Sequence, residues 1–306
     1  MLNRRRNKAV GGTEERRNAA GMQRSVACAV LAAALYALNA PVSKLLLRNV
    51  PPTMMAGFLY LGAGAGMALM GLVRKKTSRR RRETPLTKKD LPYTLGMVLL
   101  DIAAPIFLMI GLTRTTAANA SLLNNFEIVA TSLIALLIFR EKIGKRLLIA
   151  IGLITLSSIL LSVEDADSLR FSVGSLFVLL ACVCWGLENN CTRCLSHGDP
   201  LEVVVIKGFG SGIGSVLIGL AVGEALPLWS DILKILLLGF VAYGLSIYFY
   251  VYAQRDLGAA KTSAYYAVAP FIGVLLSFVI FREMPGPLFF AALLIMIAGT
   301  WMVTRE

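Results

Sequence analysis

Polar side chains recur at helical spacing within an apolar stretch at residues 115–139. Ser121, Asn124 and Glu127 follow one another at intervals of three, so they share roughly one face of a helix, with Asn125 beside them. Glu127 lies about 12 residues from either end of the stretch, which would place it near the midplane of a membrane. A carboxyl group at that depth can bind a proton or a substrate ammonium group in turn. We therefore predict a substrate-binding role for this polar patch.

Other polar side chains occupy similar depths in other apolar stretches. Asp101 lies about eight residues into the stretch 93–112, and Asn39 lies about 14 residues into its own stretch. Glu188 and Asn189 are neighbours in a third. An ionisable side chain at bilayer depth costs roughly 2.5–3.5 kcal/mol, so such residues usually face a partner or a watery cavity. We predict that these four residues also bind substrate.

A structural alternative remains open for Glu127, because a buried partner such as Lys207 or an asparagine amide could simply neutralise it. For Lys44 and Arg193, near the ends of their stretches, the sequence favours long stems that extend to the interface, and Lys207 could also extend to the cytoplasmic interface. Lys207 is therefore not expected to bind substrate.

Tyrosines add a second group of candidates. Tyr243 lies deep in its stretch and Tyr265 lies early in the next one. Tyrosines near the ends of a membrane span are explained by the aromatic belt, whereas deeper rings can line a cavity. If these rings line a cavity, the substrate is organic and partly apolar rather than an inorganic ion.

The elements that must position these residues are membrane-spanning helices. Hydrophobic residues make up 57% of the chain, well above the roughly 45–50% of a soluble domain. Apolar runs of 18 or more residues predict membrane spans. The sequence predicts an all-α polytopic fold with ten spans, at residues 25–47, 54–73, 93–112, 115–139, 145–163, 172–193, 201–222, 232–253, 259–281 and 287–304.

The net charge of +13 is distributed unevenly between the two predicted sides. One side holds 23 basic residues: seven before the first span, nine between spans two and three, four between spans four and five, and three elsewhere; the other side holds four. This asymmetry follows the positive-inside rule and places both termini in the cytoplasm. Topology thus accounts for the charge without nucleic-acid binding. The basic residues of the arginine-rich loop 74–89 are explained equally well by the positive-inside rule and by contact with anionic lipids.

The cysteines and the single histidine do not predict a metal or other cofactor. Cys191 and Cys194 have the spacing of a metal-binding or redox pair, but a zinc site needs about two more ligands. His197 is one candidate and no fourth is evident. We predict that the cysteines are small apolar packing residues, with no disulfide framework.

The two halves of the chain share similar sequence motifs in the same order. Phe139-Arg140-Glu141 recurs 142 residues later as Phe281-Arg282-Glu283, after equivalent predicted spans. Residues 36–44 of span one match residues 185–193 of span six, each with an aromatic, polar residues, a hydroxyl and a cation. Glycines in spans two and seven also match, and we expect them to allow close helix packing. Five crossings separate equivalent helices, so the halves are predicted to be inverted repeats at residues 25–163 and 172–304, after a basic segment 1–24.

This order of motifs resembles the EamA family of exporters in the drug/metabolite transporter superfamily. The resemblance covers residues 25–304 and rests on the two repeats, on Trp185 and Arg193 in span six, and on Pro270 before the second Phe-Arg-Glu. It implies a plasma-membrane carrier that moves small organic metabolites, often outward, through a central cavity between the halves. The two halves differ at one pair of aligned positions. The second half has Ala269 and Pro270 there, whereas the first half has Glu127 and the residue that follows it.

Three functions remain in competition. The favoured one is a secondary transporter of amino acids or related metabolites that alternates access between its inverted halves, with a proton as one candidate coupling ion. No phosphate-binding loop of the Gly-rich Lys-Ser/Thr type is present, so ATP is not expected to drive it. An intramembrane enzyme would need a nucleophile and base, paired aspartates or metal ligands. A membrane scaffold would not require so many buried polar groups.

Overall fold

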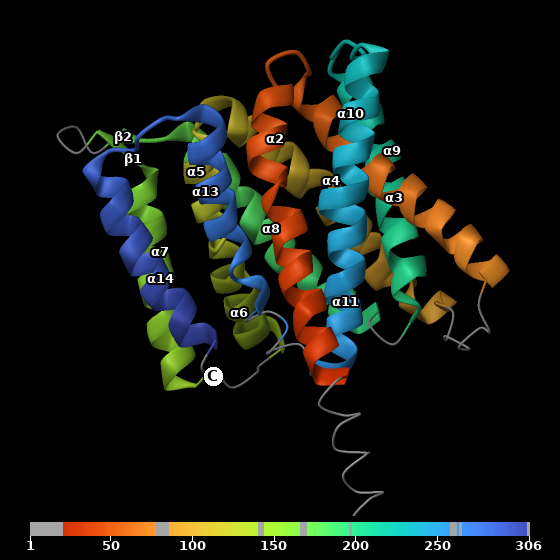
Figure 1. The fold of residues 1–306 in the computed structure, drawn as a ribbon, viewed down its shortest axis with the longest axis horizontal. Helices are drawn as coiled ribbons and strands as arrows, with labels where there is room; N and C mark the ends of the chain where they lie inside the picture. The colour runs from red at the N-terminus through yellow and green to blue at the C-terminus, as the bar shows by residue number, and fades with distance from the viewer. Residues whose placement is uncertain are drawn as a thin grey trace, which may run out of the picture.

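The computed structural model describes residues 21–77, 86–139, 144–165, 170–195, 198–257, 262 and 265–304. Within these ranges the chain is a bundle of roughly parallel and antiparallel helices (Figure 1). The first helix covers residues 21–37, and the others are α2 Asn39–Leu46, α3 Pro52–Thr77, α4 Leu91–Arg114, α5 Ala117–Leu123, α6 Phe126–Phe139, α7 Lys145–Ser162, α8 Val173–Leu195, α9 Pro200–Ala221, α10 Trp229–Gly239, α11 Ser246–Leu257, α13 Ala269–Phe281 and α14 Pro287–Thr304. The short 3₁₀-helix η1 covers Lys88–Asp90, and the π-helical turn η2 covers Phe240–Leu245.

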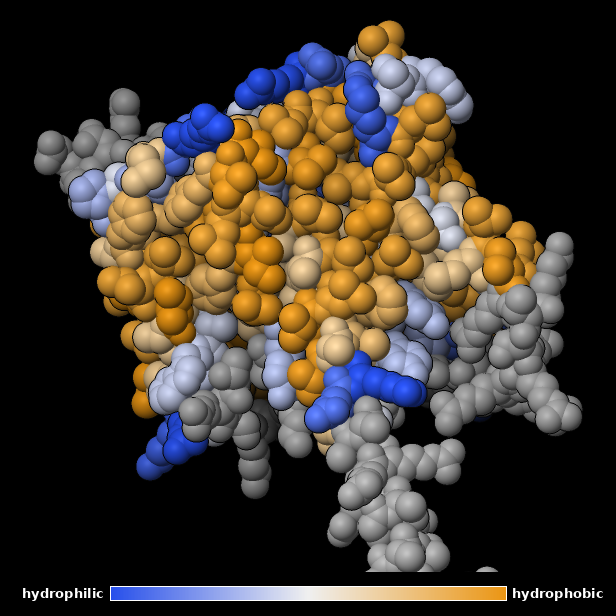
Figure 2. Space-filling view, in the orientation of Figure 1, coloured by the Kyte–Doolittle hydropathy of each residue, from blue (hydrophilic) through white to orange (hydrophobic). Residues whose placement is uncertain are grey.

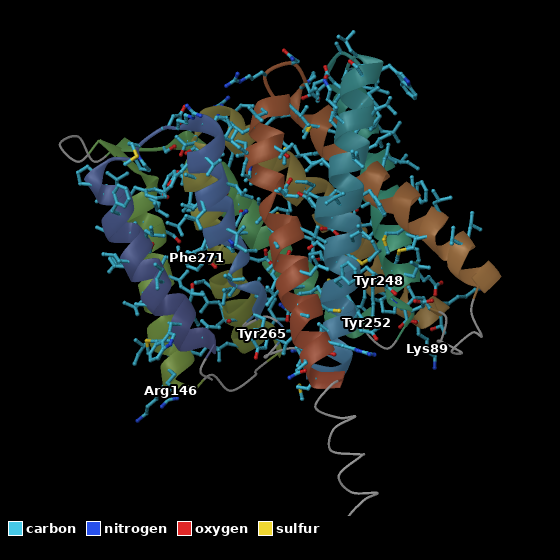
Figure 3. The ribbon with its side chains drawn as sticks, viewed as in Figure 1. Lys89, Arg146, Tyr248, Tyr252, Tyr265 and Phe271 are labelled. Atoms are coloured by element: carbon cyan, nitrogen blue, oxygen red, sulfur yellow. The ribbon has the colours of Figure 1, made fainter. Side chains whose placement is uncertain are left out.

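Two short strands close one end of the bundle. β1 (Val163–Asp165) and β2 (Arg170–Phe171) pair antiparallel. They lie at the upper end in Figure 1, whereas the helix that begins at residue 21 and the end of α14 lie at the lower end. Lys89 and Arg146, from two of the predicted basic segments, lie at this lower end as well (Figure 3).

Eight of the ten predicted spans are confirmed as helical segments long and apolar enough to cross a membrane. They are Gly21–Leu46, Pro52–Val73, Lys88–Arg114, Ala117–Ile138, Lys145–Ser162, Val173–Leu195, Pro200–Ala221 and Trp229–Ala253. The other two predicted spans contain the shorter apolar helices Ala269–Phe281 and Pro287–Val303. For the predicted span 259–281, residues 258–261 and 263–264 lie outside the described residues, and a turn at 267–268 precedes α13.

An apolar belt crosses the face of the bundle seen in Figure 2, between two more polar ends. Large apolar side chains point outward along it, including Leu99, Leu137 and Val279, which are 65%, 74% and 73% exposed. A soluble monomer rarely exposes apolar patches of this extent, whereas lipid tails accommodate them. The chain is a multi-pass helical membrane protein.

Glycines let the helices approach closely inside the belt. A Cβ added to Gly64 of α3 would lie 2.9 Å from the backbone nitrogen of Phe209 on α9. A Cβ on Gly212 of α9 would lie 2.7 Å from the backbone nitrogen of Leu61. Neither position has room for a larger side chain, which confirms the packing role predicted for these glycines.

Several membrane helices are interrupted inside the bundle. The first helix is separated from α2 at Leu38, α5 from α6 at residues 124–125, and α13 begins after a turn at residues 267–268. Pro41 and Pro270 have no N–H to continue the helical hydrogen bonds, and asparagine side chains compete for backbone groups. The predicted span 115–139 is therefore present as the helical segment Ala117–Ile138, with a turn at its middle where the two asparagines lie.

Candidate functional site

Three charged side chains meet in the interior of the bundle. The Nζ atom of Lys207 on α9 lies 3.0 Å from Oδ2 of Asp101 on α4 and 3.0 Å from Oε1 of Glu188 on α8. The side chains are only 8%, 0% and 3% exposed, respectively. The prediction that Lys207 extends to the interface is wrong, because two buried carboxylates hold its ammonium group inside.

Hydroxyl groups complete this cluster, which we call the acidic centre: Asp101, Glu188, Lys207 and the two hydroxyl residues Tyr60 and Thr192. The Tyr60 hydroxyl donates to Oδ1 of Asp101 at 2.8 Å, and the Thr192 hydroxyl donates to Oε1 of Glu188. Two carboxyl groups face one ammonium group, so the cluster has one acid more than it has bases. Such a site favours a proton or another cation, because an uncompensated buried charge is costly.

Glu127 lies beside the acidic centre but has a different partner. The side-chain amide of Asn189 donates to its Oε1 atom at 2.6 Å and to the Thr131 hydroxyl at 3.3 Å. Of the two partners considered for Glu127, the structure shows the asparagine amide, while Lys207 pairs with other acids. Glu127 and Asn189 come from α6 and α8, so the bond joins the predicted first and second halves.

Asn39 and Tyr243 form a further bridge between the halves. The Asn39 amide donates to the Tyr243 hydroxyl at 3.0 Å, and the Ser43 hydroxyl donates to Oδ1 of Asn39 at 3.1 Å. The Tyr243 ring lies 5.0 Å from the Tyr60 ring and 6.0 Å from the Tyr36 ring, centroid to centroid. Tyr243 is 2% exposed. The tyrosine thus connects Asn39 to the acidic centre through the ring of Tyr60.

The remaining polar residues of the predicted patch lie at the end of α5. Ser121, Asn124 and Asn125 are buried, at 3%, 8% and 2% exposed. Within the described residues, Ser121 Oγ, Asn124 Oδ1 and Asn125 Nδ2 have no hydrogen-bond partner. Ser121 and Asn124 line a small hollow, and Glu127 is not among its lining residues. Of the predicted patch, Ser121 and Asn124 line this hollow, whereas Glu127 bonds to Asn189.

Tyr265 does not join the other predicted site residues. It is 41% exposed and lies toward the lower end of the bundle (Figure 3). The next residue, Tyr266, points inward, with its ring 5.8 Å from that of Tyr36 and its hydroxyl 3.4 Å from that of Ser246. The turn before α13 shifts the helical phase relative to the continuous helix predicted for 259–281, so the adjacent tyrosine takes the inward position.

A cavity of about 690 Å³ lies near the strand end of the bundle. Its lining includes the cations Lys44, Arg48 and Arg114 and the acid Glu283. Lys44 Nζ donates to the carbonyl oxygens of Leu112 and Thr115 at the end of α4. A cation at a helix C-terminus is favoured by the free carbonyls and the helix dipole. The cavity is large enough for a small organic solute.

The described part of the chain contains no grouping of three or more His, Cys, Asp and Glu side chains that could hold a metal ion. His197 lies outside the described residues. In the part of the chain that the structure describes, no cysteine is in a disulfide, and Cys182 is buried with its thiol directed to the Leu123 carbonyl at 3.6 Å. This contact is consistent with the packing role predicted for it.

Sequence reasoning considered Lys207 in the polar interior only as a partner of Glu127, and it missed Tyr60 and Thr131. A usable signal existed for the lysine and for Tyr60, because a lysine or a tyrosine several residues inside an apolar span costs energy unless it has partners. Thr131 carries no such signal, since threonine is common in membrane helices and can bond to its own helix.

The fold and its interior define a polytopic helical membrane protein with a buried, hydrogen-bonded polar centre. The chain belongs to the EamA-like transporter family, which matches residues 23–163 and again residues 172–305.

Two relatives agree with this membership, and a solved structure shares the fold. An uncharacterized transporter of Methanothermobacter thermautotrophicus is 26% identical over 276 residues, covering 83% of this chain and 78% of the relative. The uncharacterized transporter YyaM of Bacillus subtilis is 21% identical over 214 residues, covering 65% of this chain and 68% of that protein. A crystal structure with 18% sequence identity superposes with a TM-score of 0.64, covering 92% of this chain and 96% of the other, which shows a shared fold.

Proposed function

We propose that this protein is a secondary transporter that exports small organic metabolites, such as amino acids or related compounds, across the plasma membrane. Residues 25–163 and 172–304 would move against each other as two inverted five-helix repeats, with both termini in the cytoplasm. The observation that carries the proposal is the acidic centre. Its charged residues come from both halves, so relative movement of the halves must rearrange them.

The pairing of helices supports the inverted repeats. The most extensive helix contacts include α3 with α9 and α7 with α14. In the predicted repeat, α3 corresponds to α9 and α7 to α14. A two-fold axis in the membrane plane would bring such equivalent helices face to face. The two successive matches to one family, at residues 23–163 and 172–305, agree with a duplicated unit.

The acids supply the proposed binding chemistry. Glu127, Asp101 and Glu188 can bind a cationic group of the substrate or a coupling proton in turn, and movement of the halves would change which partner each acid faces. The tyrosines around Tyr243 offer apolar ring faces for the remainder of an organic solute. The cavity of about 690 Å³ near the strand end is large enough to admit such a solute.

The direct test uses purified protein in sealed liposomes loaded with a panel of labelled metabolites. We expect at least one amino acid or related compound to leave the liposomes faster than from protein-free liposomes, and to be recovered chemically unchanged. Recovery of a chemically altered compound would instead identify an intramembrane enzyme. Equal leakage with and without protein across the panel would favour a scaffold.

The variant Asp101→Asn gives this assay a matched comparison. It keeps the size of the side chain and the hydrogen bond from Tyr60 but removes one carboxylate from Lys207. Reduced flux in a folded variant would support the acidic centre as part of the pathway, and wild-type flux would contradict that assignment.

A further inference from the structure

A small hollow lies where three interrupted helices meet. Its lining includes Ala37 at the end of the first helix, Ser121 and Asn124 at the end of α5, and Pro270 and Gly273 at the start of α13. Its volume is about 10 Å³, close to that of one water-sized sphere. No carboxylate, lysine or arginine lines it.

Oxygen atoms without donors face this hollow. Ser121 Oγ and Asn124 Oδ1 have no hydrogen-bond partner within the described residues. The carbonyl of Ala37 lacks its ordinary helical donor, because the residue four positions later is Pro41, which has no N–H. The position that a Cβ on Gly273 would occupy lies 2.8 Å from Ser121 Oγ and 3.4 Å from the Ala37 oxygen. These two oxygens therefore converge on one point beside the glycine.

The surrounding backbone does not supply the missing donors. On the α13 side, Pro270 has no N–H, and the amides of Phe271 and Ile272 both donate to the Val268 carbonyl, at 3.1 and 3.2 Å. On the α5 side, the amide of Asn124 donates to the Ala120 carbonyl at 3.2 Å. These backbone amides are thus already engaged, and a small cation could satisfy the oxygens of Ser121, Asn124 and Ala37 that have no donor.

The helix ends add to this preference. The first helix is interrupted after residue 37 and α5 ends at Leu123, and both interruptions lie beside this hollow. Half-helix C-termini and unwound carbonyls are the groups that coordinate small cations inside membrane transporters generally. The ligands are hard, neutral oxygens, which suit a single positive charge better than a divalent ion.

We propose that this hollow binds one small monovalent cation of the size of Na⁺, held by Ser121 Oγ, Asn124 Oδ1 and the Ala37 carbonyl oxygen. The site is separate from the acidic centre. The ligands of the site come from the first half of the chain, and Gly273 on the second half forms its opposite wall. A bound ion would therefore stabilise the packing of α13 on α5. A coupling of this ion to solute movement rests on the proposed transport function, whereas its binding does not.

Thermal unfolding of the purified full-length protein tests the binding, with sodium chloride replaced stepwise by choline chloride at constant ionic strength. We expect sodium to raise the midpoint of unfolding in a saturable manner, because a ligand that binds only the folded state stabilises it. Ser121→Ala should shift the half-saturating sodium concentration upward by about tenfold or more, since a tenfold weakening corresponds to the loss of about 1.4 kcal/mol of binding free energy. Gly273→Ala should abolish the sodium effect, because the added methyl group would occupy the site 2.8 Å from Ser121 Oγ.

Ser158→Ala is the matched control. Its hydroxyl is also buried but donates to the Ile154 carbonyl at 2.8 Å, and it does not line the hollow. The control should keep the wild-type response to sodium even if its stability changes. Equal midpoints for the wild type in sodium and choline would overturn the proposal and leave a hollow that holds a water molecule. An unchanged sodium response in both Ser121→Ala and Gly273→Ala would overturn this location for the ion. Neither result depends on whether the protein transports a solute.

Discussion

The side-chain amide of Asn39 donates a hydrogen bond to the hydroxyl of Tyr243, 3.0 Å away, although 204 residues separate them in the chain. The Ser43 hydroxyl, one helical turn beyond Asn39, donates to the other atom of the same amide group. This small network joins α2 to η2 and so connects the two halves.

The aligned positions of the other half form a charged version of the same network. In the predicted repeat, Glu188 corresponds to Asn39, Thr192 to Ser43, and Asp101 to Tyr243. The Thr192 hydroxyl donates to Glu188, and Lys207 bridges Glu188 to Asp101. A neutral bridge and an ionic bridge thus occupy corresponding places. Where the neutral bridge has the amide of Asn39 and the phenol of Tyr243, the ionic bridge has the carboxylates of Glu188 and Asp101. The carboxylates are therefore found at only one of the two corresponding places.

Lys207→Met should be strongly destabilising. The substitution leaves Asp101 and Glu188 together without a counter-charge in the interior, and removal of one partner from a buried ion pair costs about 3–5 kcal/mol. Lys234 provides the control, because it pairs with Asp231 at 2.8 Å but is 62% exposed, and Lys234→Met should cost at most about 1 kcal/mol. The free energies of unfolding in detergent should separate the two variants. Similar losses would mean that the buried lysine is not needed to neutralise the acids.

Asp101→Asn combined with Lys207→Met should recover part of this loss. One carboxylate and the ammonium are then removed together, so Glu188 alone remains to be neutralised by a proton. A double-mutant cycle measures the coupling between the two residues. Additive effects would contradict the ion pair seen between Asp101 Oδ2 and Lys207 Nζ.

Glu127→Gln should weaken transport and leave folding intact. A glutamine oxygen can still accept the hydrogen bond from Asn189, so the local packing is kept while the ability to bind a proton or an ammonium group is lost. The measurement is solute flux in proteoliposomes beside thermal stability in detergent. Glu202→Gln at the start of α9 is the control and should keep wild-type flux. Full transport by the Glu127→Gln variant would contradict a role for this carboxylate in transport.

Tyr243→Phe tests the neutral bridge between the halves. It keeps the ring packed on Tyr60 and removes the acceptor of the Asn39 amide, so a buried donor loses its partner at a cost of about 1–3 kcal/mol. Tyr265→Phe is the matched control, because that tyrosine is 41% exposed, and its stability should change by no more than about 0.5 kcal/mol. Equal unfolding free energies for the two variants would argue against the hydrogen bond.

The burial of the polar residues inside the bundle could be predicted from the sequence, but the particular partner of each could not. The position of Glu127 along an apolar run gives its height in the membrane directly, since a helix rises by a fixed amount per residue. Its bond to Asn189 depends on how α6 rotates against α8, which no linear pattern specifies. Lys207 illustrates the same limit, because its stem is long enough to reach either the interface or the two acids.

The interruptions of the helices account for the other differences. The apolar stretch 115–139 was predicted as one span, and the structure has a turn at Asn124 and Asn125 within it. The turn before α13 likewise directs Tyr266 inward and leaves Tyr265 outside. Periodicity assigns a face only while the helix is unbroken, so a side chain beyond a break cannot be placed from spacing alone.

Gly208→Ala should destabilise the protein by disrupting the close backbone contact between α3 and α9, which we call the seam. A Cβ at this position would lie 2.9 Å from the Tyr60 carbonyl oxygen and closer still to the backbone of Gly64, so the two helices would have to move apart. Overpacking of this kind typically costs about 1–3 kcal/mol, and contact with backbone rather than side-chain atoms argues for the upper part of that range. Separation of the helices would also move Lys207, the preceding residue, away from Asp101.

Gly152→Ala on α7 separates this steric effect from the general effect of the substitution. No atom lies within 4 Å of a Cβ at that position, and alanine favours a helix over glycine by up to about 1 kcal/mol, so this variant should be neutral or more stable. Thermal unfolding of both proteins in the same detergent gives the comparison. A Gly208→Ala protein as stable as the Gly152→Ala protein would mean that α3 and α9 are not held in close backbone contact, and that the acidic centre does not depend on this seam for its geometry.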